Sequence, residues 1–460
     1  MLIREIFKAN DIRGVVGGDS PGWDADGART LGVAFVQLTG LAGGRFVLGR
    51  DMRVTGEQMS LAFAEGAASA GADVEVLGLT STDQLWYASG DADAHGVQFT
   101  ASHNPAAYNG IKFCLPGAQP VTADFLTDLA DRAFALEAVP AAPVERPGRI
   151  SFRDSLAGYA DYLRSLVPLD GMRHLSVVVD AGNGMAGHTV TAVLGDANIE
   201  IIGLFLDLDG SFPNHEPNPL IPENLLDAQA AVREHGADLA LVFDGDADRC
   251  FIIDERGEVI TPSTITALIA EAELERVPGS TIVVNSITSR AVAEVVAENG
   301  GHLVTSRVGH TFVKALMAEH DAIFGGEHSA HYYFRDFWGA DTGMLAALHV
   351  LRLRGHSDRP LSELVRHFER YVNSGEINSV VDDASACTAR VGERFSSRGV
   401  VNWDDGLRVD GLDAVGEPWW FSLRASNTEP LLRLNVEARS EPVMQALRDE
   451  VLALVRQNAS

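Results

Sequence analysis

Short apolar runs alternate along the chain with longer segments in which apolar residues recur at helical spacing. A unit of apolar strand, polar turn, alanine-rich helix and second strand occurs three times. Its strands are expected at 45–51 and 73–77, at 176–180 and 200–204, and at 281–285 and 302–306, and its helices near 56–70, 188–194 and 289–299. Such a repeated unit predicts parallel strands joined by crossover helices.

Turn-forming segments divide the chain into four parts. A Pro/Ala-rich stretch over 139–147 is typical of a linker, and a helix is expected over 152–166. Further boundaries are expected near the turn at 254–257 and near 372–376, and the last part ends in an amphipathic helix over 441–456. We therefore predict an α/β fold of three similar mixed-sheet α/β domains in series plus a smaller C-terminal α+β domain. The expected domains cover residues 1–145, 150–254, 255–370 and 371–460.

Charge and cysteine content argue against several kinds of partner, structural site and location. The 460 residues carry a formal net charge of −28, which argues against a nucleic-acid or anionic-membrane partner because both require basic surface. Cys114, Cys250 and Cys387 are too few and too scattered for a disulfide framework or a zinc site. The N-terminus lacks the apolar core of a signal peptide, and no apolar run approaches the ~18 residues of a membrane span. We therefore predict a cytoplasmic protein.

A serine-containing turn follows one of the expected strands. Residues 100–105, here called the serine loop, read Thr-Ala-Ser-His-Asn-Pro and come directly after the apolar run 96–99. Ser102 therefore leaves the carboxyl end of a strand, where open α/β sheets bind ligands, and is a candidate nucleophile. An ordinary turn is the alternative, because Ser, Asn and Pro all favour turns.

Lys112 lies a few residues beyond the serine loop and is one of only three lysines among 36 basic residues. A lysine can lose its proton in a pocket, whereas an arginine effectively cannot. We therefore consider Lys112 for proton transfer or phosphate contact, with a surface lysine kept by chance as the alternative.

Three carboxylates occur at alternate positions after the expected strand 239–243. Asp244, Asp246 and Asp248 belong to residues 244–249, here called the aspartate loop, and converge on a hard divalent cation. A calcium-binding helix–loop–helix fits less well, because Arg249 takes the position of its glycine and the flanks are strands. We predict that these residues bind Mg²⁺ and that a phosphate oxygen completes its coordination shell. A solvated acidic loop without a metal is the alternative.

Two further loops offer groups for a polar or anionic ligand. The sugar loop, residues 325–331, reads Gly-Gly-Glu-His-Ser-Ala-His and suits sugar hydroxyls, although it could be an ordinary strand end. The phosphate loop, residues 424–430, reads Arg-Ala-Ser-Asn-Thr-Glu-Pro and suits a phosphate, with a hydrogen-bonded turn as the alternative. Residues 7–14 and 49–53 add arginines at loop positions, which exposed ion pairs would also explain.

The four loops occur in the order and rough spacing of the α-D-phosphohexomutase superfamily, which the whole chain resembles. It is most similar to the bacterial phosphomannomutase branch, on the segment 212–219 (Phe-Pro-Asn-His-Glu-Pro-Asn-Pro) and on the Glu-His-Ser triplet of the sugar loop. The resemblance implies four domains around a central cleft and interconversion of mannose 6-phosphate with mannose 1-phosphate, leading to GDP-mannose. Phosphoglucomutase, or dual specificity, is the alternative activity.

The resemblance also implies a role for each loop residue. Ser102 would be a phosphoserine and would hold Mg²⁺ together with Asp244, Asp246 and Asp248. A hexose 1,6-bisphosphate would be the intermediate and the activator. The hexose phosphate substrate would be bound by Glu327, Ser329, Arg249, Arg424, Ser426, Asn427 and Thr428. Acid–base or phosphate roles would fall to Arg13, His103, Lys112 and His331.

Two other classes of function compete with a mutase. A Ser–His hydrolase could use Ser102, but no Gly-x-Ser-x-Gly elbow surrounds it. A non-catalytic sugar-phosphate-binding protein would keep the phosphate loop without needing the three aspartates. The resemblance allows either a monomer or a homodimer.

Overall fold

The computed structural model describes residues 1–122, 124–139, 141, 144–425 and 431–457. They form two compact units. Unit 1 comprises Met1–Pro262 and Ser329–Leu364, and unit 2 comprises Ser263–His328 and the described chain from Val365 onward. None of the described helices has both the length and the apolar composition that crossing a membrane requires.

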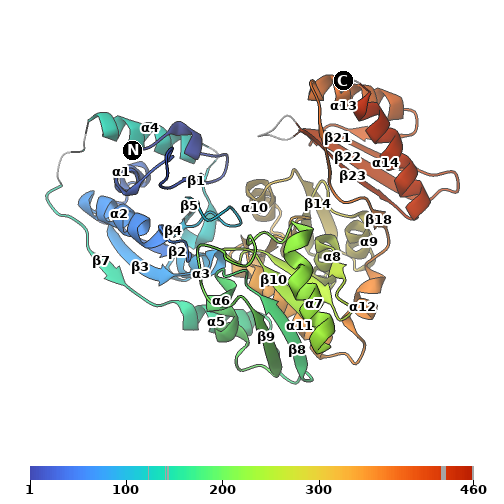
Figure 1. The fold of residues 1–460 in the computed structure, drawn as a ribbon, viewed down its shortest axis with the longest axis horizontal. Helices are drawn as coiled ribbons and strands as arrows, with labels where there is room; N and C mark the ends of the chain where they lie inside the picture. Colours follow the sequence, from blue (N-terminus) through green and yellow to red (C-terminus); the bar gives the residue numbers. More distant parts are fainter. Residues whose placement is uncertain (123, 140, 142–143, 426–430, 458–460) are drawn as a thin grey trace. The chain divides into compact units, whose positions relative to one another are not determined.

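The first sheet of unit 1 carries the serine loop and has the strand order β1-β5-β4-β2-β3-β7, with β6 paired to β5 (Figure 1). Strand β2 pairs in parallel with β3 and β4, whereas β5 is antiparallel to β1 and β4. The strands are β1 (Ile12–Val15), β2 (Arg45–Arg50), β3 (Asp73–Leu79), β4 (His95–Phe99), β5 (Tyr108–Leu115), β6 (Gln119–Pro120) and β7 (Ile150–Phe152). The helices are η1 (Arg4–Ile6), α1 (Ala25–Thr39), α2 (Gly56–Ser69), α3 (Thr82–Ala92), η2 (Pro116–Ala118) and α4 (Phe125–Ala138).

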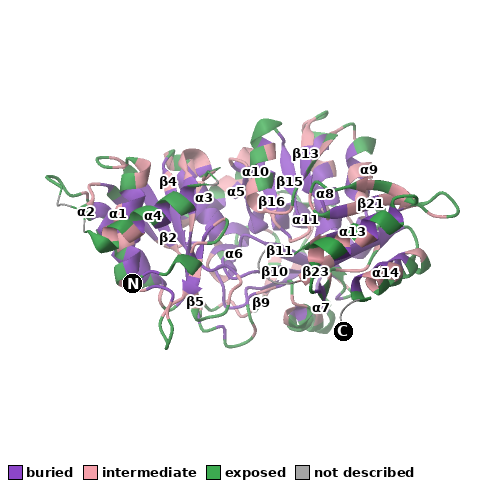
Figure 2. Ribbon diagram, turned by 90° about the horizontal axis from the view of Figure 1, so that it is seen from above, coloured by how far each residue is buried: buried purple, intermediate pink, exposed green. Residues whose placement is uncertain are grey.

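A cluster of aromatic rings forms the core under α1, α2 and α4. The ring of Phe35 on α1 packs on Phe46 and Phe113 of the sheet, and Phe63 on α2 packs on Phe46 and Phe99. Buried aromatic side chains contribute large apolar areas, so this core holds β4, and with it the start of the serine loop, in a fixed place. Figure 2 shows the strands mostly buried, with exposed residues on the outer helix faces.

The second sheet of unit 1 carries the aspartate loop and has the order β12-β11-β10-β8-β9. Strand β8 is parallel to β9 and β10, and the aspartate loop joins β10 to its antiparallel neighbour β11. The strands are β8 (Leu175–Asp180), β9 (Ile199–Leu204), β10 (Leu239–Phe243), β11 (Cys250–Asp254) and β12 (Val259–Ile260). The helices are α5 (Leu156–Leu166), α6 (Ala186–Leu194), η3 (Pro222–Leu225) and α7 (Leu226–His235). Every residue of β10 and β11 is buried.

The returning segment of unit 1 adds a short antiparallel pair and a buried helix. Its elements are β16 (Tyr332–Phe334), η4 (Arg335–Phe337), β17 (Ala340–Asp341), α11 (Gly343–Gly355) and α12 (Leu361–Leu364).

Unit 2 contains a parallel α/β part and an antiparallel part. In the first, β13 (Thr281–Asn285) is parallel to β14 (His302–Ser306) and β15 (Phe324–Gly326). Its helices are α8 (Pro262–Arg276), α9 (Arg290–Glu298) and α10 (His310–Glu319).

The second part of unit 2 is an antiparallel sheet of order β18-β23-β22-β21-β20, with β19 also paired to β23. Helices α13 and α14 bury their apolar faces in one core with this sheet. The elements are η5 (Val365–His367), β18 (Val372–Asn373), β19 (Ile377–Val380), α13 (Ala384–Phe395), β20 (Gly399–Asn402), β21 (Leu407–Leu412), β22 (Pro418–Ala425), β23 (Leu431–Ala438) and α14 (Glu441–Arg456).

The three repeated units predicted from the sequence are present, because β2 and β3, β8 and β9, and β13 and β14 are parallel pairs joined through helices. The helix expected over 152–166 begins later than predicted. Phe152 ends the edge strand β7, which pairs with β3, and α5 starts at Leu156, whose N–H is accepted by the Asp154 carboxylate at 2.8 Å. Within the expected linker, Pro140, Ala142 and Pro143 lie outside the described residues.

A buried polar node joins distant stretches of unit 1. The carboxylate of Asp83, in the first turn of α3, accepts the hydroxyls of Ser81, Tyr159 (2.6 Å) and Thr342 (2.7 Å). Tyr159 lies on α5, and Thr342 caps α11. Burial raises the pKa of Asp83 to about 6, even though the three donors favour the ionised form.

We expect the wild-type protein to lose stability relative to Asp83→Asn as the pH rises from about 4 to about 6. A carboxyl whose pKa is raised from 3.8 to about 6 in the folded state stabilises the fold fully only below the lower value. The difference in unfolding free energy should change by about 3 kcal/mol across this range in urea titrations. Exposed Asp91→Asn on the same helix is the control, and a difference that does not vary with pH would contradict this prediction.

Candidate active site

The serine loop holds Ser102 in a left-handed backbone conformation beside the aspartate loop. The residue has φ +49° and is buried, and its N–H donates to Thr100 Oγ1 at 2.8 Å. Its hydroxyl donates to Asp244 Oδ2 at 2.8 Å. Left-handed φ is uncommon for residues other than glycine and is found at functional sites. The structure therefore brings the predicted nucleophile and the predicted metal loop together.

The three aspartates form one buried cluster on the turn between β10 and β11. Asp244, Asp246 and Asp248 are at most 1% exposed, and each offers a carboxylate oxygen within 4.8 Å of the others. The Oδ1 atoms of Asp246 and Asp248 are buried and have no hydrogen-bond partner within the described part of the chain. Converging carboxylate oxygens with such open positions are the donor set of a hard divalent cation, so these residues fit a metal.

Basic side chains surround this cluster. Lys112 on β5 donates to Asp246 Oδ2 at 2.7 Å and to Asp248 Oδ2 at 2.5 Å. Arg249 donates through Nε and Nη2 to Asp244 Oδ2 at 2.9 and 2.8 Å. These cations offset part of the cost of burying three like charges.

The pKa values of Asp244 and Asp246 are shifted in opposite directions. Burial opposes ionisation of Asp246, yet the Lys112 ammonium holds the pKa of Asp246 below its ordinary value. Burial raises the pKa of Asp244 to about 7, although Arg249 opposes this shift. Burial would also lower the pKa of Lys112, but Asp246 and Asp248 raise it above its ordinary value, so Lys112 is an ammonium in this arrangement.

His103 contacts the Ser102 hydroxyl, and Arg13 contacts the serine loop. His103 Nδ1 lies 3.3 Å from Ser102 Oγ and also contacts Arg249 Nη2. Burial, assisted by Arg249 and Arg13, lowers the pKa of His103 to about 2, so its imidazole is neutral. Arg13 on β1 pairs with Asp11 at 2.8 Å and donates to the Asn104 side chain at 2.6 Å.

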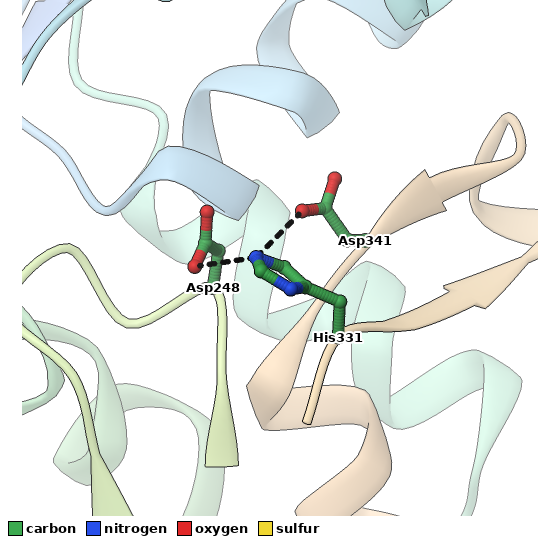
Figure 3. Close-up of side chains that lie close together, drawn as sticks. All are labelled: Asp248, His331 and Asp341. Atoms are coloured by element: carbon green, nitrogen blue, oxygen red, sulfur yellow. Dashed lines mark ion pairs between the residues drawn. The ribbon is translucent and has the colours of Figure 1, made fainter. Parts of the chain in front are cut away.

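His331 joins the cluster from the returning segment of unit 1, as Figure 3 shows. Its Nε2 atom lies 3.7 Å from Asp248 Oδ1 and 4.0 Å from Asp341 Oδ2, and its Nδ1 contacts Ser329 Oγ at 3.1 Å. A backbone bridge between Arg249 and His331 fixes the two segments together.

The remaining predicted residues belong to unit 2. Glu327 follows β15, where its carboxylate accepts the Asn285 side chain at 3.4 Å and the Gly309 N–H at 3.2 Å. Arg424 lies on β22, in the antiparallel sheet, and its Nε is 3.2 Å from Asp405 Oδ2. Ser426, Asn427 and Thr428 lie outside the described residues.

Comparison with known families matches this chain to four family profiles in order. They are the alpha/beta/alpha domains I, II and III and the C-terminal domain of "Phosphoglucomutase/phosphomannomutase", which match residues 4–139, 157–257, 261–371 and 376–454. The chain belongs to the phosphoglucomutase/phosphomannomutase family. Membership confirms the resemblance, the α/β fold of three similar domains with a C-terminal domain, and the prediction of an isomerase.

Individual members of this family match the chain almost from end to end. A phosphomannomutase of Salmonella montevideo is 41% identical and covers 98% of both chains. A phosphomannomutase of Escherichia coli strain K12 is 40% identical and covers 98% of this chain and 99% of its own. The crystal structure of a phosphoglucomutase/phosphomannomutase family protein from Burkholderia thailandensis superposes with a TM-score of 0.88 at 31% identity, over 99% and 98% of the two chains.

Three site residues of this family member escaped the sequence analysis. The Thr82 hydroxyl donates to Asp246 Oδ2 at 2.5 Å, and Asp341 lies beside His331. No sequence pattern signals the Thr82 contact, because its partner Asp246 is 164 positions away. Arg53 was noted as an arginine at a loop position, with an exposed ion pair as the ordinary explanation; the pair with Asp51 exists, but it is fully buried.

Proposed function

We propose that the protein is a phosphomannomutase that interconverts mannose 6-phosphate and mannose 1-phosphate through a phosphoserine and a hexose 1,6-bisphosphate. The observation that carries the proposal is the contact of the Ser102 hydroxyl with Asp244 amid the buried carboxylates and cations. Further support comes from relatives near 40% identity that are named phosphomannomutase.

In the proposed reaction, phosphorylated Ser102 gives its phosphoryl group to a hydroxyl of the hexose phosphate. The bond from phosphorus to the seryl oxygen breaks as the bond to the sugar oxygen forms, and the sugar hydroxyl gives up its proton. The bisphosphate then reorients, and its other phosphate returns to Ser102. Phosphoryl transfer depends chiefly on positioning and on neutralising charge, which Arg249 and Lys112 are placed to do.

We assign the proton transfer to His331. The carboxylates of Asp248 and Asp341 lie near its Nε2 atom, so a proton taken up there is balanced by neighbouring negative charge. His103 is a weaker candidate as a base, because its pKa is held near 2. Lys112 is protonated while it pairs with the aspartates, and this favours a role in contacting phosphate.

The aspartate loop and the phosphoserine would hold Mg²⁺ through Asp244, Asp246, Asp248 and Ser102. A bound ion would supply charge neutralisation at the transferring phosphoryl group. The open Oδ1 positions of Asp246 and Asp248 support this assignment.

Recognition of the substrate is assigned to the other loops. Glu327 and Ser329 would bind sugar hydroxyls, and Arg424 with Ser426, Asn427 and Thr428 would bind the phosphate that does not react. We propose that the four loops belong to the four domains expected from the sequence. The buried free cysteines support a cytoplasmic location.

Ser102→Ala should lower turnover by roughly 10⁴-fold or more, because the group that accepts and returns the phosphoryl moiety is lost. Turnover of mannose 1-phosphate is measured in a coupled assay, and circular dichroism verifies the fold. Ser69→Ala on α2 is the control, and full activity of Ser102→Ala would eliminate the scheme. Release of inorganic phosphate without an isomerised sugar would favour a hydrolase.

The wild-type enzyme should prefer mannose 1-phosphate over glucose 1-phosphate by about tenfold in kcat/KM, equivalent to ~1.4 kcal/mol. The two sugars are compared side by side with a trace of glucose 1,6-bisphosphate as primer. Equal values would support dual specificity, and a reversed preference would support a phosphoglucomutase.

Removal of divalent metal should abolish turnover, and added Mg²⁺ should restore it, since three buried carboxylates converge with a phosphoserine. The assay is turnover after chelator treatment, paired with calorimetric titration of Mg²⁺. Asp246→Asn should weaken Mg²⁺ binding by at least about tenfold, whereas exposed Asp128→Asn on α4 should not. Undiminished turnover in metal-free protein would rule out this role of the loop.

A further inference from the structure

The guanidinium of Arg53 lies fully buried beneath the serine loop, and its five N–H groups meet five acceptors. Nε donates to Asp51 Oδ2 at 3.2 Å. The two terminal nitrogens donate to backbone carbonyls at 2.7–2.9 Å, namely those of Ser102, Asn104, Pro105 and Tyr108. Arg53 therefore binds the backbone of the serine loop and of the turn that leads into β5.

The serine loop needs such a partner for two reasons. Its carbonyls lie in a turn, where a buried carbonyl without a donor is costly. In addition, the left-handed conformation of Ser102 persists only where its surroundings fix it. Arg53 meets both needs, because it supplies four donors at once, to the carbonyl of the strained residue and to three carbonyls that follow it in the chain.

The aspartate loop also lies close to the Ser102 carbonyl. A Cβ atom on Gly245 would lie 2.5 Å from the Ser102 carbonyl oxygen, so this approach requires glycine. The Ser102 carbonyl thus contacts the Arg53 guanidinium and lies against the backbone of the aspartate loop. Movement of Arg53 would shift the seryl oxygen relative to Asp244.

A second contact ties Arg53 to the segment 212–219 that the sequence analysis singled out. The guanidinium lies over the Phe212 ring at 5.2 Å from its centroid, a favourable cation–π geometry. The same segment touches the aspartate loop, because a Cβ on Gly245 would lie 3.2 Å from Pro217 Cγ. Arg53 therefore contacts the serine loop directly and reaches the aspartate loop through the segment 212–219.

We propose that Arg53 is a positioning residue for phosphoryl transfer, which fixes the serine loop so that the Ser102 oxygen stays aligned with the aspartate loop. It acts through the loop backbone and not through the substrate. Lysine cannot replace it, because an ammonium has three donors and lacks the planar fork. This inference rests on the proposed function and deepens it.

The test is Arg53→Lys, assayed with mannose 1-phosphate under the conditions used for the wild-type enzyme. We expect kcat to fall by about 10²-fold, the effect of a displacement near 1 Å, while KM changes by less than about threefold. Amide hydrogen exchange should accelerate in the peptide spanning 102–108 and stay unchanged in α14. The control is Arg45→Lys in the same sheet, an exposed arginine that donates to the Ala92 carbonyl at 3.1 Å.

Two results would overturn the inference. One is a folded Arg53→Lys with kcat within about threefold of the wild-type value; the other is faster exchange spread evenly over unit 1, which would mark a general loss of stability. If Arg53→Lys does not fold, Asp51→Asn takes its place, with an expected kcat loss of about tenfold. Unchanged kcat and unchanged hydrogen exchange in Asp51→Asn would also overturn the inference. A wild-type protein without mutase activity would refute the proposed function. The hydrogen exchange of residues 102–108 in Arg53→Lys would then still test whether Arg53 fixes the serine loop.

Discussion

Burial of three aspartates on one loop is the constraint on which the rest of unit 1 depends. Like charges removed from water repel one another unless cations or hydrogen-bond donors accompany them. Part of the compensation comes from other elements, namely an ammonium on β5 at Lys112 and a hydroxyl at the start of α3 at Thr82, and part from the guanidinium of Arg249 on the loop itself. The electrostatics of the site therefore joins the first sheet to the second, and the catalytic geometry and the packing of unit 1 share the same contacts.

The residues of the proposed site are distributed over both units. The nucleophile, the acidic cluster and His331 all belong to unit 1, where hydrogen bonds and ion pairs connect them. Glu327 and Arg424, to which we assign recognition of the sugar and its phosphate, belong to unit 2. Ser329, to which we also assign a sugar contact, lies in unit 1, so the proposed recognition residues are not confined to one unit.

Sequence reasoning predicted those features that local patterns encode. The repeated strand–helix–strand unit predicted the parallel pairs, and the spacing of Asp244, Asp246 and Asp248 predicted the acidic cluster. It did not predict contacts between residues far apart in the sequence, such as that of Thr82 with Asp246, because no local pattern of residues indicates them. The burial of Arg53 was missed as well, since four of its five acceptors are backbone carbonyls, which every residue carries.

The order in which the chain is made has a consequence for Asp83. The sequence of unit 1 is interrupted after Pro262 and resumes at Ser329. Thr342, which donates a hydrogen bond to Asp83, lies in this later segment. Domains generally fold from the N-terminus as they leave the ribosome. The 66 intervening positions Ser263–His328 and the segment after them must be translated before Thr342 is available. Until then the Asp83 carboxylate lacks one of its three hydroxyl donors. The hydrogen bonds of Asp83 are therefore completed late in biosynthesis.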